Sequence, residues 1–414
     1  MPHLAAALIW TISLGSILLM LVRPRGIAEA WWIGAGALLL VLTRLLPLAG
    51  AAHAIHEGLD VYLFLIGMML LAETARYEGV FDWVAGVAAS HARGSAARLF
   101  LLVYLAGTIV TIFLSNDATA VVLTPAVLAA VRRANVQSRP YLLICAFIAN
   151  AASFVLPISN PANLVIFDAR MPPLATWLRI FLLPSVASIL TTYFILYFLS
   201  RQQFAETVAD SYVAPLATAG KAALAGIVIA ALVLLVASGL GWQLGAPTCA
   251  VGVLAVLMVT LRDRRAAFIV VRGVSWSVIP LVAGLFMIVE ALNRGGMLYL
   301  AERGLRWTAK LSVLAGKLAA GFAVGLLSNG MNNLPVGLAS GSALRHAQIS
   351  GAIQHAVLVG VDLGPNLSVT GSLATILWLI ALRREGVEIT GWEFLKAGMI
   401  AMPIALLAGL LALF

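Results

Sequence analysis

The chain has little charge and very little cysteine. Asp, Glu, Lys and Arg together make up 10% of its 414 residues, whereas apolar residues make up 62%. No joint between apolar segments is long enough to form a soluble domain. The two cysteines, Cys145 and Cys249, stand 104 positions apart within apolar sequence, so the sequence indicates neither a disulfide framework nor a clustered metal site. We expect no metal and no cofactor.

Long apolar segments make up most of the chain. The mean hydropathy is +1.03, and the segments run for roughly 17–22 residues between short polar joints, the pattern of an all-α integral membrane protein. The first segment, Leu4–Val22, ends at Arg23 and Arg25 without a basic stretch before it, so we interpret it as a retained span, not a signal peptide. The net charge of +9 reflects basic loops and does not indicate nucleic-acid binding.

Ten segments are predicted to cross the membrane. They are Leu4–Val22, Trp31–Leu46, Leu59–Leu71, Tyr141–Phe167, Ile180–Leu199, Ala222–Leu240, Leu244–Leu261, Trp276–Leu292, Ile353–Leu382 and Phe394–Leu413. Two further segments, Asp82–Ala92 and Leu298–Thr308, are predicted to be interfacial helices.

Two further apolar regions are predicted to be re-entrant hairpins, at 98–133 and 310–345. The arms of the first, Leu99–Leu114 and Ala118–Val131, would be about 24 Å and 21 Å long as helices, short of the roughly 30 Å hydrocarbon core. The polar turn between them is Ser115-Asn116-Asp117. The corresponding turn of the second hairpin is predicted at Ser328-Asn329-Gly330.

Loop charges give an orientation. With the N-terminus outside and each hairpin returning to its own side, 17 of the 26 basic residues fall in cytoplasmic joints. This bias predicts that both termini lie on the external, periplasmic side of a multi-pass protein of the cell inner (plasma) membrane.

The two halves of the chain match in the order of their elements. Leu114–Asp117 and Leu327–Gly330 are offset by 213 positions, and the polar breaks within 140–167 and 351–384 have nearly the same offset. We predict two inverted repeats, 1–200 and 221–414, joined by a cytoplasmic linker at 201–220. Interrupted segments at matching places in two such halves point to a transport site near the membrane midplane.

The polar residues at these breaks are the candidate site. Asp117, at the first hairpin turn, is a carboxyl group at membrane depth, where ionisable side chains are costly and usually functional. It could instead only cap the second arm. Asp362 is the second such carboxyl, with an N-cap or a structural ion pair as its alternative. Glu73 and Glu290, at the ends of matching spans, are interpreted as snorkelling or capping carboxylates.

The remaining candidates are amides and hydroxyls. Ser159, Asn160 and Asn163 follow Pro157, a proline that frees backbone groups. The alternative is a purely structural kink. The paired Asn332 and Asn333 could bind a solute or could hold helices together.

At these residues the sequence resembles a known family. SNDATAVVLTP (Ser115–Pro125), SNGMNNLP (Ser328–Pro335) and DLGPNLSVTGSLATILW (Asp362–Trp378) are similar to signatures of the ArsB-type arsenite efflux permeases, within the ion transporter superfamily. The similarity extends to the closing GWEFLKAG (Gly391–Gly398). The chain departs from the family where Asn150-Ala151 replaces an Asp-Thr pair, and in having Pro161.

The resemblance implies secondary active export of trivalent arsenite or antimonite in exchange for protons, on an inverted-repeat fold. Such permeases can also work with a soluble ATPase subunit. Matched position by position, it implies proton-coupling roles for Asp117 and Asp362. It implies substrate-binding roles for Asn116, Ser159, Asn160, Asn332, Asn333, Asn366, Thr370 and Ser372.

The chemistry of the motifs is consistent with this substrate. Arsenite near neutral pH is mostly the uncharged triol, which needs hydroxyl and amide partners, and the substrate motifs contain no Arg or Lys. The alternatives left open are a Na⁺/H⁺ antiporter, a Na⁺-coupled anion carrier and a passive channel. No nucleophile–base pair or metal-ligand cluster appears in the spans, so we do not expect an enzyme.

Overall fold

The computed structural model describes residues 2–167, 171–205, 207–209 and 213–413. Within these ranges the fold is helical, and the only β pairing is an isolated bridge between Ser95 and Thr207. The helices of the first half are α1 (Pro2–Val22), η1 (Pro24–Gly26), α2 (Glu29–Leu42), α3 (Leu48–Glu57), α4 (Leu59–Tyr77), α5 (Val80–Ser90), α6 (Ala96–Phe113), α7 (Asn116–Ala118), η2 (Thr119–Leu123), α8 (Thr124–Arg133), α9 (Arg139–Ala151), η3 (Pro157–Ser159), α10 (Pro161–Phe167), α11 (Leu174–Ser200) and η5 (Arg201–Ala205).

The second half has a similar series. Its helices are α12 (Thr218–Gly239), α13 (Gly245–Thr260), α14 (Arg264–Gly273), α15 (Val278–Arg294), α16 (Met297–Ala309), α17 (Val313–Met331), α18 (Asn333–Ala347), α19 (Ala352–Leu363), η6 (Gly364–Leu367), η7 (Val369–Gly371), α20 (Leu373–Arg384) and α21 (Gly391–Leu411). The linker predicted at 201–220 falls partly outside the described residues, at 206 and 210–212.

This fold confirms an all-α membrane protein. In the described part of the chain seven helices are long and apolar enough to cross a bilayer, or eight if α3 and α4, which bend by 46° at their joint, form one span. Each of the ten predicted spans coincides with one helix or with one broken pair. The two predicted interfacial segments are the helices α5 and α16, whereas α3 and α14 were not foreseen.

Each predicted broken span is interrupted as expected. The chain leaves helical geometry between α9 and α10, and again between α19 and α20. Pro157 opens the short 3₁₀ turn of the first break, and Pro365 lies in the first turn of the second. Since proline lacks the N–H that a helix interior requires, these positions favour a break.

The first hairpin turns where the sequence predicts, because α6 ends at Phe113 and α7 begins at Asn116. The predicted turn of the second hairpin, Ser328–Gly330, is wrong. Helix α17 continues through these residues to Met331, and the chain turns at Asn332, which has a left-handed φ of 75°. With a ψ of 150°, the backbone of Asn332 has a conformation that residues other than glycine rarely adopt, and the Asn332 Oδ1 atom accepts a hydrogen bond from the Leu334 N–H at 3.4 Å.

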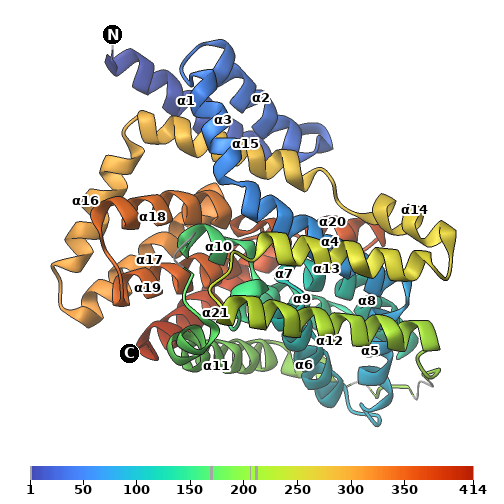
Figure 1. Ribbon diagram of the computed structural model, residues 1–414. Helices are drawn as coiled ribbons and strands as arrows, with labels where there is room; N and C mark the ends of the chain where they lie inside the picture. Colours follow the sequence, from blue (N-terminus) through green and yellow to red (C-terminus); the bar gives the residue numbers. More distant parts are fainter. Residues whose placement is uncertain (1, 168–170, 206, 210–212, 414) are drawn as a thin grey trace.

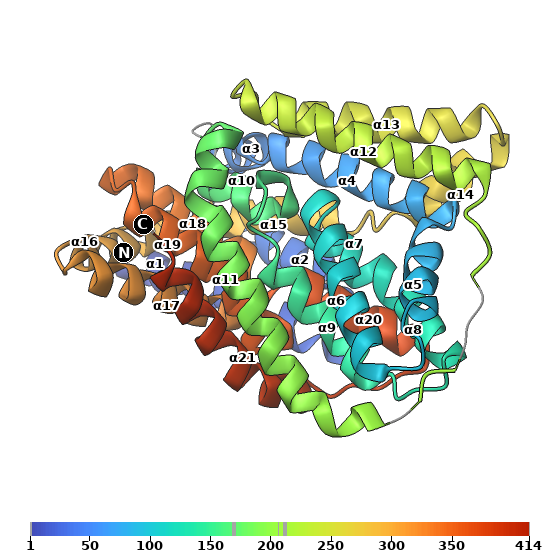
Figure 2. The same ribbon diagram turned by 90° about the horizontal axis from the view of Figure 1, so that it is seen from below.

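Helices of opposite halves pack against each other at both edges of the molecule. α13 lies along α4 with α12 beside it (Figure 2), and α2 and α3 lie along α15 with α1 beside α2 (Figure 1). In the interior, α10 packs on α18 and α20 packs on η2, so the second arm of each broken span meets the hairpin of the other half.

Glycines allow the closest of these contacts. A Cβ atom on Gly252 of α13 would lie 2.5 Å from the Gly67 carbonyl oxygen of α4. A Cβ atom on Gly360 of α19 would lie 2.2 Å from the Gly321 carbonyl oxygen of α17. Both distances are far below van der Waals contact, so these helices pack backbone against backbone.

A side chain at Gly360 should therefore separate the hairpin from the broken span. We expect Gly360→Ala to destabilise the protein by about 1–3 kcal/mol, the usual effect of overpacking. Gly34→Ala is the matched control, because nothing lies within 4 Å of a Cβ atom at that helical position. Thermal unfolding in detergent measures both variants, and equal midpoints would contradict the close contact.

Candidate functional site

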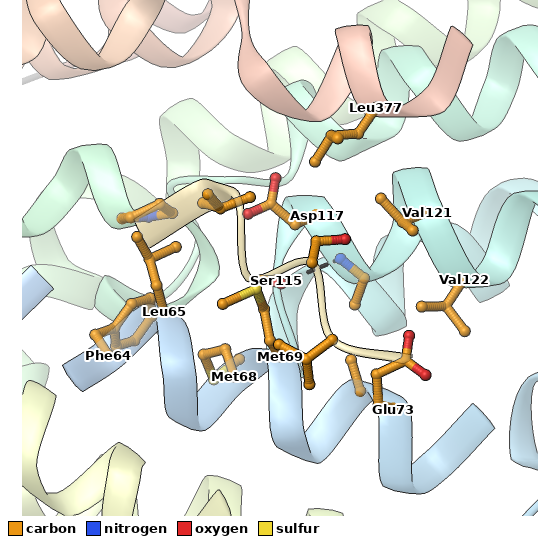
Figure 3. Close-up of a pocket in the computed structure, with 16 residues that line it drawn as sticks. Phe64, Leu65, Met68, Met69, Glu73, Ser115, Asp117, Val121, Val122 and Leu377 are labelled. Carbon is orange, nitrogen blue, oxygen red and sulfur yellow. Dashed lines mark hydrogen bonds between the residues drawn. The ribbon is translucent and has the colours of Figure 1, made fainter. Parts of the chain in front are cut away.

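A cavity of about 40 Å³ lies between α4, the first hairpin tip and the start of α15. That is room for a few water-sized molecules. Figure 3 shows Met68, Met69 and Glu73 projecting from α4 toward the tip that carries Ser115 and Asp117. Most of its lining is apolar, and its polar side chains are Glu73, Ser115, Asp117 and Ser275. No lysine, arginine or histidine lines it, so the charged groups of this cavity are carboxylates.

The hairpin tip holds Asp117 by capping its short helix with other side chains. The Ser115 hydroxyl accepts a hydrogen bond from the Ala118 N–H at 3.2 Å, and the Asn116 Oδ1 atom accepts one from the Asp117 N–H at 2.9 Å. The Asp117 carboxylate makes no hydrogen bond or ion pair with any described residue. Capping therefore occupies Ser115 and Asn116, and it leaves the Asp117 carboxylate facing the cavity.

The helix after the tip is irregular. Thr119–Leu123 forms a π-helix, in which the Thr124 hydroxyl donates to the Thr119 carbonyl oxygen at 3.1 Å. The hydroxyls of Thr111 and Thr119 meet at 2.8 Å and join the two arms of the hairpin. Such π-helical turns occur frequently at functional sites.

Glu73 faces the same cavity, although the sequence interpretation treated it as a capping or snorkelling group. It is only 7% exposed, and the Arg76 Nε and Nη2 atoms both lie 2.6 Å from its Oε2 atom. A Cβ atom on Gly273 would lie 2.4 Å from that oxygen, so α14 packs directly on the ion pair. In the sequence, only the spacing indicates that Glu73 faces inward. Leu65, Met69 and Glu73 recur every four residues, so they share one face of α4.

Asp362 lies in a separate, fully buried network. The Asn160 Nδ2 group donates to the Asp362 Oδ1 atom at 2.8 Å, which joins the broken spans of the two halves. The Asp362 Oδ2 atom has no partner among the described residues. Pro161, the residue after Asn160, lines the Asp117 cavity. The two predicted carboxyls are therefore connected through Asn160–Pro161 and do not share one cavity.

Three asparagines hold the broken spans in place. The Asn163 Nδ2 group lies within hydrogen-bond distance of three carbonyl oxygens of the first break, the nearest being Ser153 at 3.0 Å. The Asn150 Nδ2 group donates to the Asn366 Oδ1 atom at 3.0 Å, and the Asn366 Nδ2 group donates to the Phe147 carbonyl at 3.0 Å. Asn150 was absent from the predicted site, and Asn163, a candidate amide of the first break, bonds backbone carbonyls of that break.

The second hairpin tip contacts the second break. The Asn332 Nδ2 group donates to the Thr370 carbonyl at 3.4 Å, and the Thr370 hydroxyl donates to the Asn329 carbonyl at 2.9 Å. The Asn329 Oδ1 atom accepts a hydrogen bond from the Ser368 hydroxyl at 2.7 Å. Asn329 and Ser368 were also absent from the predicted site. Asn333 starts α18 and is buried.

The last two predicted residues have local partners. The Ser159 hydroxyl donates to the Ile112 carbonyl of α6 at 2.9 Å, which ties the first break to the first hairpin. The Ser372 Oγ atom accepts the Thr375 N–H at 3.1 Å and so caps α20. The predicted residues therefore lie at the hairpin tips and breaks, and only Asp117 among them lines the cavity.

Comparison with known sequences identifies relatives along almost the whole chain. It is 26% identical over 403 residues to the arsenical pump membrane protein of Yersinia enterocolitica, covering 94% of each chain. It is 26% identical over 406 residues to the arsenical pump membrane protein of Escherichia coli strain K12, again covering 94% of each chain.

Among solved structures, the fold is similar to that of the YdaH transporter from Alcanivorax borkumensis. The TM-score is 0.56 at 16% sequence identity, covering 87% of this chain and 86% of that one. This likeness shows that the two proteins share a similar fold.

The match to a family covers most of the sequence. The citrate transporter family, CitMHS, matches residues 9–360, which include Asp117, both hairpins and the first broken span. The chain is therefore a multi-pass membrane transporter that belongs to the CitMHS citrate transporter family.

Proposed function

We propose that the protein exports trivalent arsenite or antimonite, as the neutral triol, in exchange for protons. The observation that carries this proposal is the composition of the cavity at the first hairpin tip, which has Glu73 and Asp117 and no basic residue. Citrate carries up to three negative charges and would find no cation in this lining to bind it. The arsenical pump membrane proteins, which are similar along nearly the whole chain, agree with the metalloid assignment.

In this proposal Asp117 and Asp362 carry the coupled proton, and the amides and hydroxyls of the tips and breaks receive the triol. An ionised carboxylate with no internal partner, such as Asp117, is costly at this depth, which gives it a reason to exchange a proton with the cavity. Glu73, paired with Arg76, is the second carboxylate of the cavity. The carrier needs neither a resident metal nor a cofactor, and a soluble ATPase subunit could act as an additional partner.

The packing of the two halves supports an inverted repeat. The α4–α13 contact has its counterpart in the α15–α2 contact, and each broken span meets the hairpin of the other half. We propose that the repeats are 1–200 and 221–414, that both termini are external in the inner membrane, and that the hairpins and broken spans move against the remaining helices.

A second candidate, sodium coupling, is favoured by one observation. Asn150 Oδ1, Asn163 Oδ1 and Asp362 Oδ2 are buried oxygens without a hydrogen-bond partner among the described residues. Oxygen ligands with one carboxylate suit a small hard cation. Transport that requires Na⁺, and that persists without a pH gradient, would favour this candidate over proton exchange.

Replacement of the cavity carboxylate tests the coupling. In everted vesicles with an acidic interior, we expect Asp117→Asn to lower arsenite uptake on the order of tenfold, a change of about 1.4 kcal/mol. Asp362→Asn should have a similar effect. Glu388→Gln, a change at an exposed carboxylate, is the control and should transport normally. Undiminished pH-driven uptake in both aspartate variants would remove them from the coupling mechanism.

The acidic lining predicts which solutes compete. We expect excess citrate to leave arsenite uptake unchanged, because the cavity offers no cation to bind it, whereas antimonite should inhibit. Uptake of labelled arsenite in the same vesicles measures both effects. Inhibition by citrate as strong as that by antimonite would refute the metalloid assignment.

A double substitution separates the two roles of Glu73. We expect Glu73→Gln to lower transport a few-fold, since it removes an acidic group and leaves Arg76 unpaired beside the cavity. The double variant Glu73→Gln/Arg76→Gln has no unpaired charge at this place. If the role of Glu73 is purely structural, the double variant should therefore transport arsenite at the wild-type rate. Continued loss in a double variant that unfolds at the normal temperature would assign Glu73 to transport.

A further inference from the structure

Helix α16 presents a basic and aromatic face that the transport site does not use. A surface hollow of about 400 Å³ on this helix is lined by Tyr299, Glu302, Arg303, Arg306, Trp307 and Lys310. These positions recur at intervals of three and four residues, so they share one side of the helix. Tyr299 is 66% exposed and Trp307 is 59% exposed.

The charges of this face are mostly unpaired. Arg306 lies 3.8 Å from Glu302, a loose contact between exposed side chains. Arg303 and Lys310 have no ion-pair or hydrogen-bond partner in the part of the chain that the structure describes. Three cations therefore share one carboxylate, and the face has a net positive charge available for an anion.

The position of these cations is not explained by membrane orientation. In the proposed orientation α16 lies on the external side, where lysine and arginine are disfavoured, yet this helix and its C-cap residue, Lys310, together carry three basic residues. The helix at the matching place in the first half, α5, contains no lysine or arginine. The basic face is therefore not a requirement of the repeated fold.

The opposite side of α16 rests on the second hairpin. Leu305 and Thr308 are buried, and a Cβ atom on Gly316 of α17 would lie 2.5 Å from the Thr308 carbonyl oxygen. Large apolar side chains are exposed beside the hollow, at Leu300 on α16 and at Val313 and Leu314 at the start of α17. The site thus combines cations, interfacial aromatic rings and apolar surface.

We propose that this face binds the headgroup of an anionic phospholipid. Arg303, Arg306 and Lys310 bind the phosphate, since arginine forks match its oxygens. Trp307 and Tyr299 lie at the headgroup level, where aromatic rings of membrane proteins collect, and the exposed apolar side chains contact the acyl chains. A free phosphate ion would use the cations but would leave the aromatic and apolar side chains without a partner.

A bound lipid would lie against the hairpin that carries Asn332 and Asn333. Because α16 packs on both α17 and α18, the lipid would stabilise the position of this hairpin. The binding proposal itself does not depend on which substrate is transported.

The experiment compares lipid binding by the full-length protein and two triple variants. The test variant is Arg303→Gln/Arg306→Gln/Lys310→Gln. The control variant is Arg262→Gln/Arg264→Gln/Arg265→Gln, which removes the same number of exposed charges near α14. Native mass spectrometry measures retention of phosphatidylglycerol and of phosphatidylcholine from mixed micelles, and thermal unfolding in phosphatidylcholine checks that each variant is folded.

We expect the α16 variant to lose affinity for phosphatidylglycerol on the order of tenfold, while the control variant binds as the wild type does. Equal losses in both variants would show that only net charge matters and would overturn the site. Equal retention of the two lipids by the wild type would also overturn it. So would displacement of phosphatidylglycerol by millimolar inorganic phosphate, since that would identify a site for the free ion.

Discussion

The fold depends on how its interrupted helices satisfy their backbone polar groups. Inside a bilayer every unpaired N–H or carbonyl is costly, so a break in a helix needs an internal partner. Here asparagine amides supply that partner. Asn163 serves the carbonyls of the first break, and Asn366 donates to the Phe147 carbonyl beside it. Asn329 donates to the Gly325 and Gly364 carbonyls, which joins the second hairpin to the second break.

The same constraint decides which polar groups remain for a solute. Most predicted site residues are committed to caps or bridges: Asn116, Ser159 and Ser372 each bond a backbone group of their own half. Asp117 is the exception, since its carboxylate faces a cavity with no internal partner. A site built this way has few free charges, and those it has are negative. In our proposal, this composition suits a neutral solute and a proton better than an anion.

The sequence predicted the parts of this structure that hydropathy controls. The spans, the two interruptions and the first hairpin turn lie where polar residues enter apolar segments. It failed at Ser328–Gly330 because this polar string continues a helix, and only the left-handed Asn332 reverses the chain. It also misjudged Glu73, because its burial depends on Gly273, which lies about two hundred residues away in sequence. Contacts between distant helices leave no local sequence pattern, so the hydrogen-bond partners of Asn150 and Asn329 could not be predicted either.

The contact between α4 and α13 has a consequence for biosynthesis. The face of α4 that contains Gly67 packs against α13 of the other half, and α15 of the second half packs in turn against α2 of the first. During translation the first half therefore enters the membrane with one of its packing surfaces uncovered until α13 emerges. Neither half contains all the partners of its own helices, so the two halves form one folding unit. A gene split at the linker would have to produce both pieces in the same membrane before either could reach its final packing.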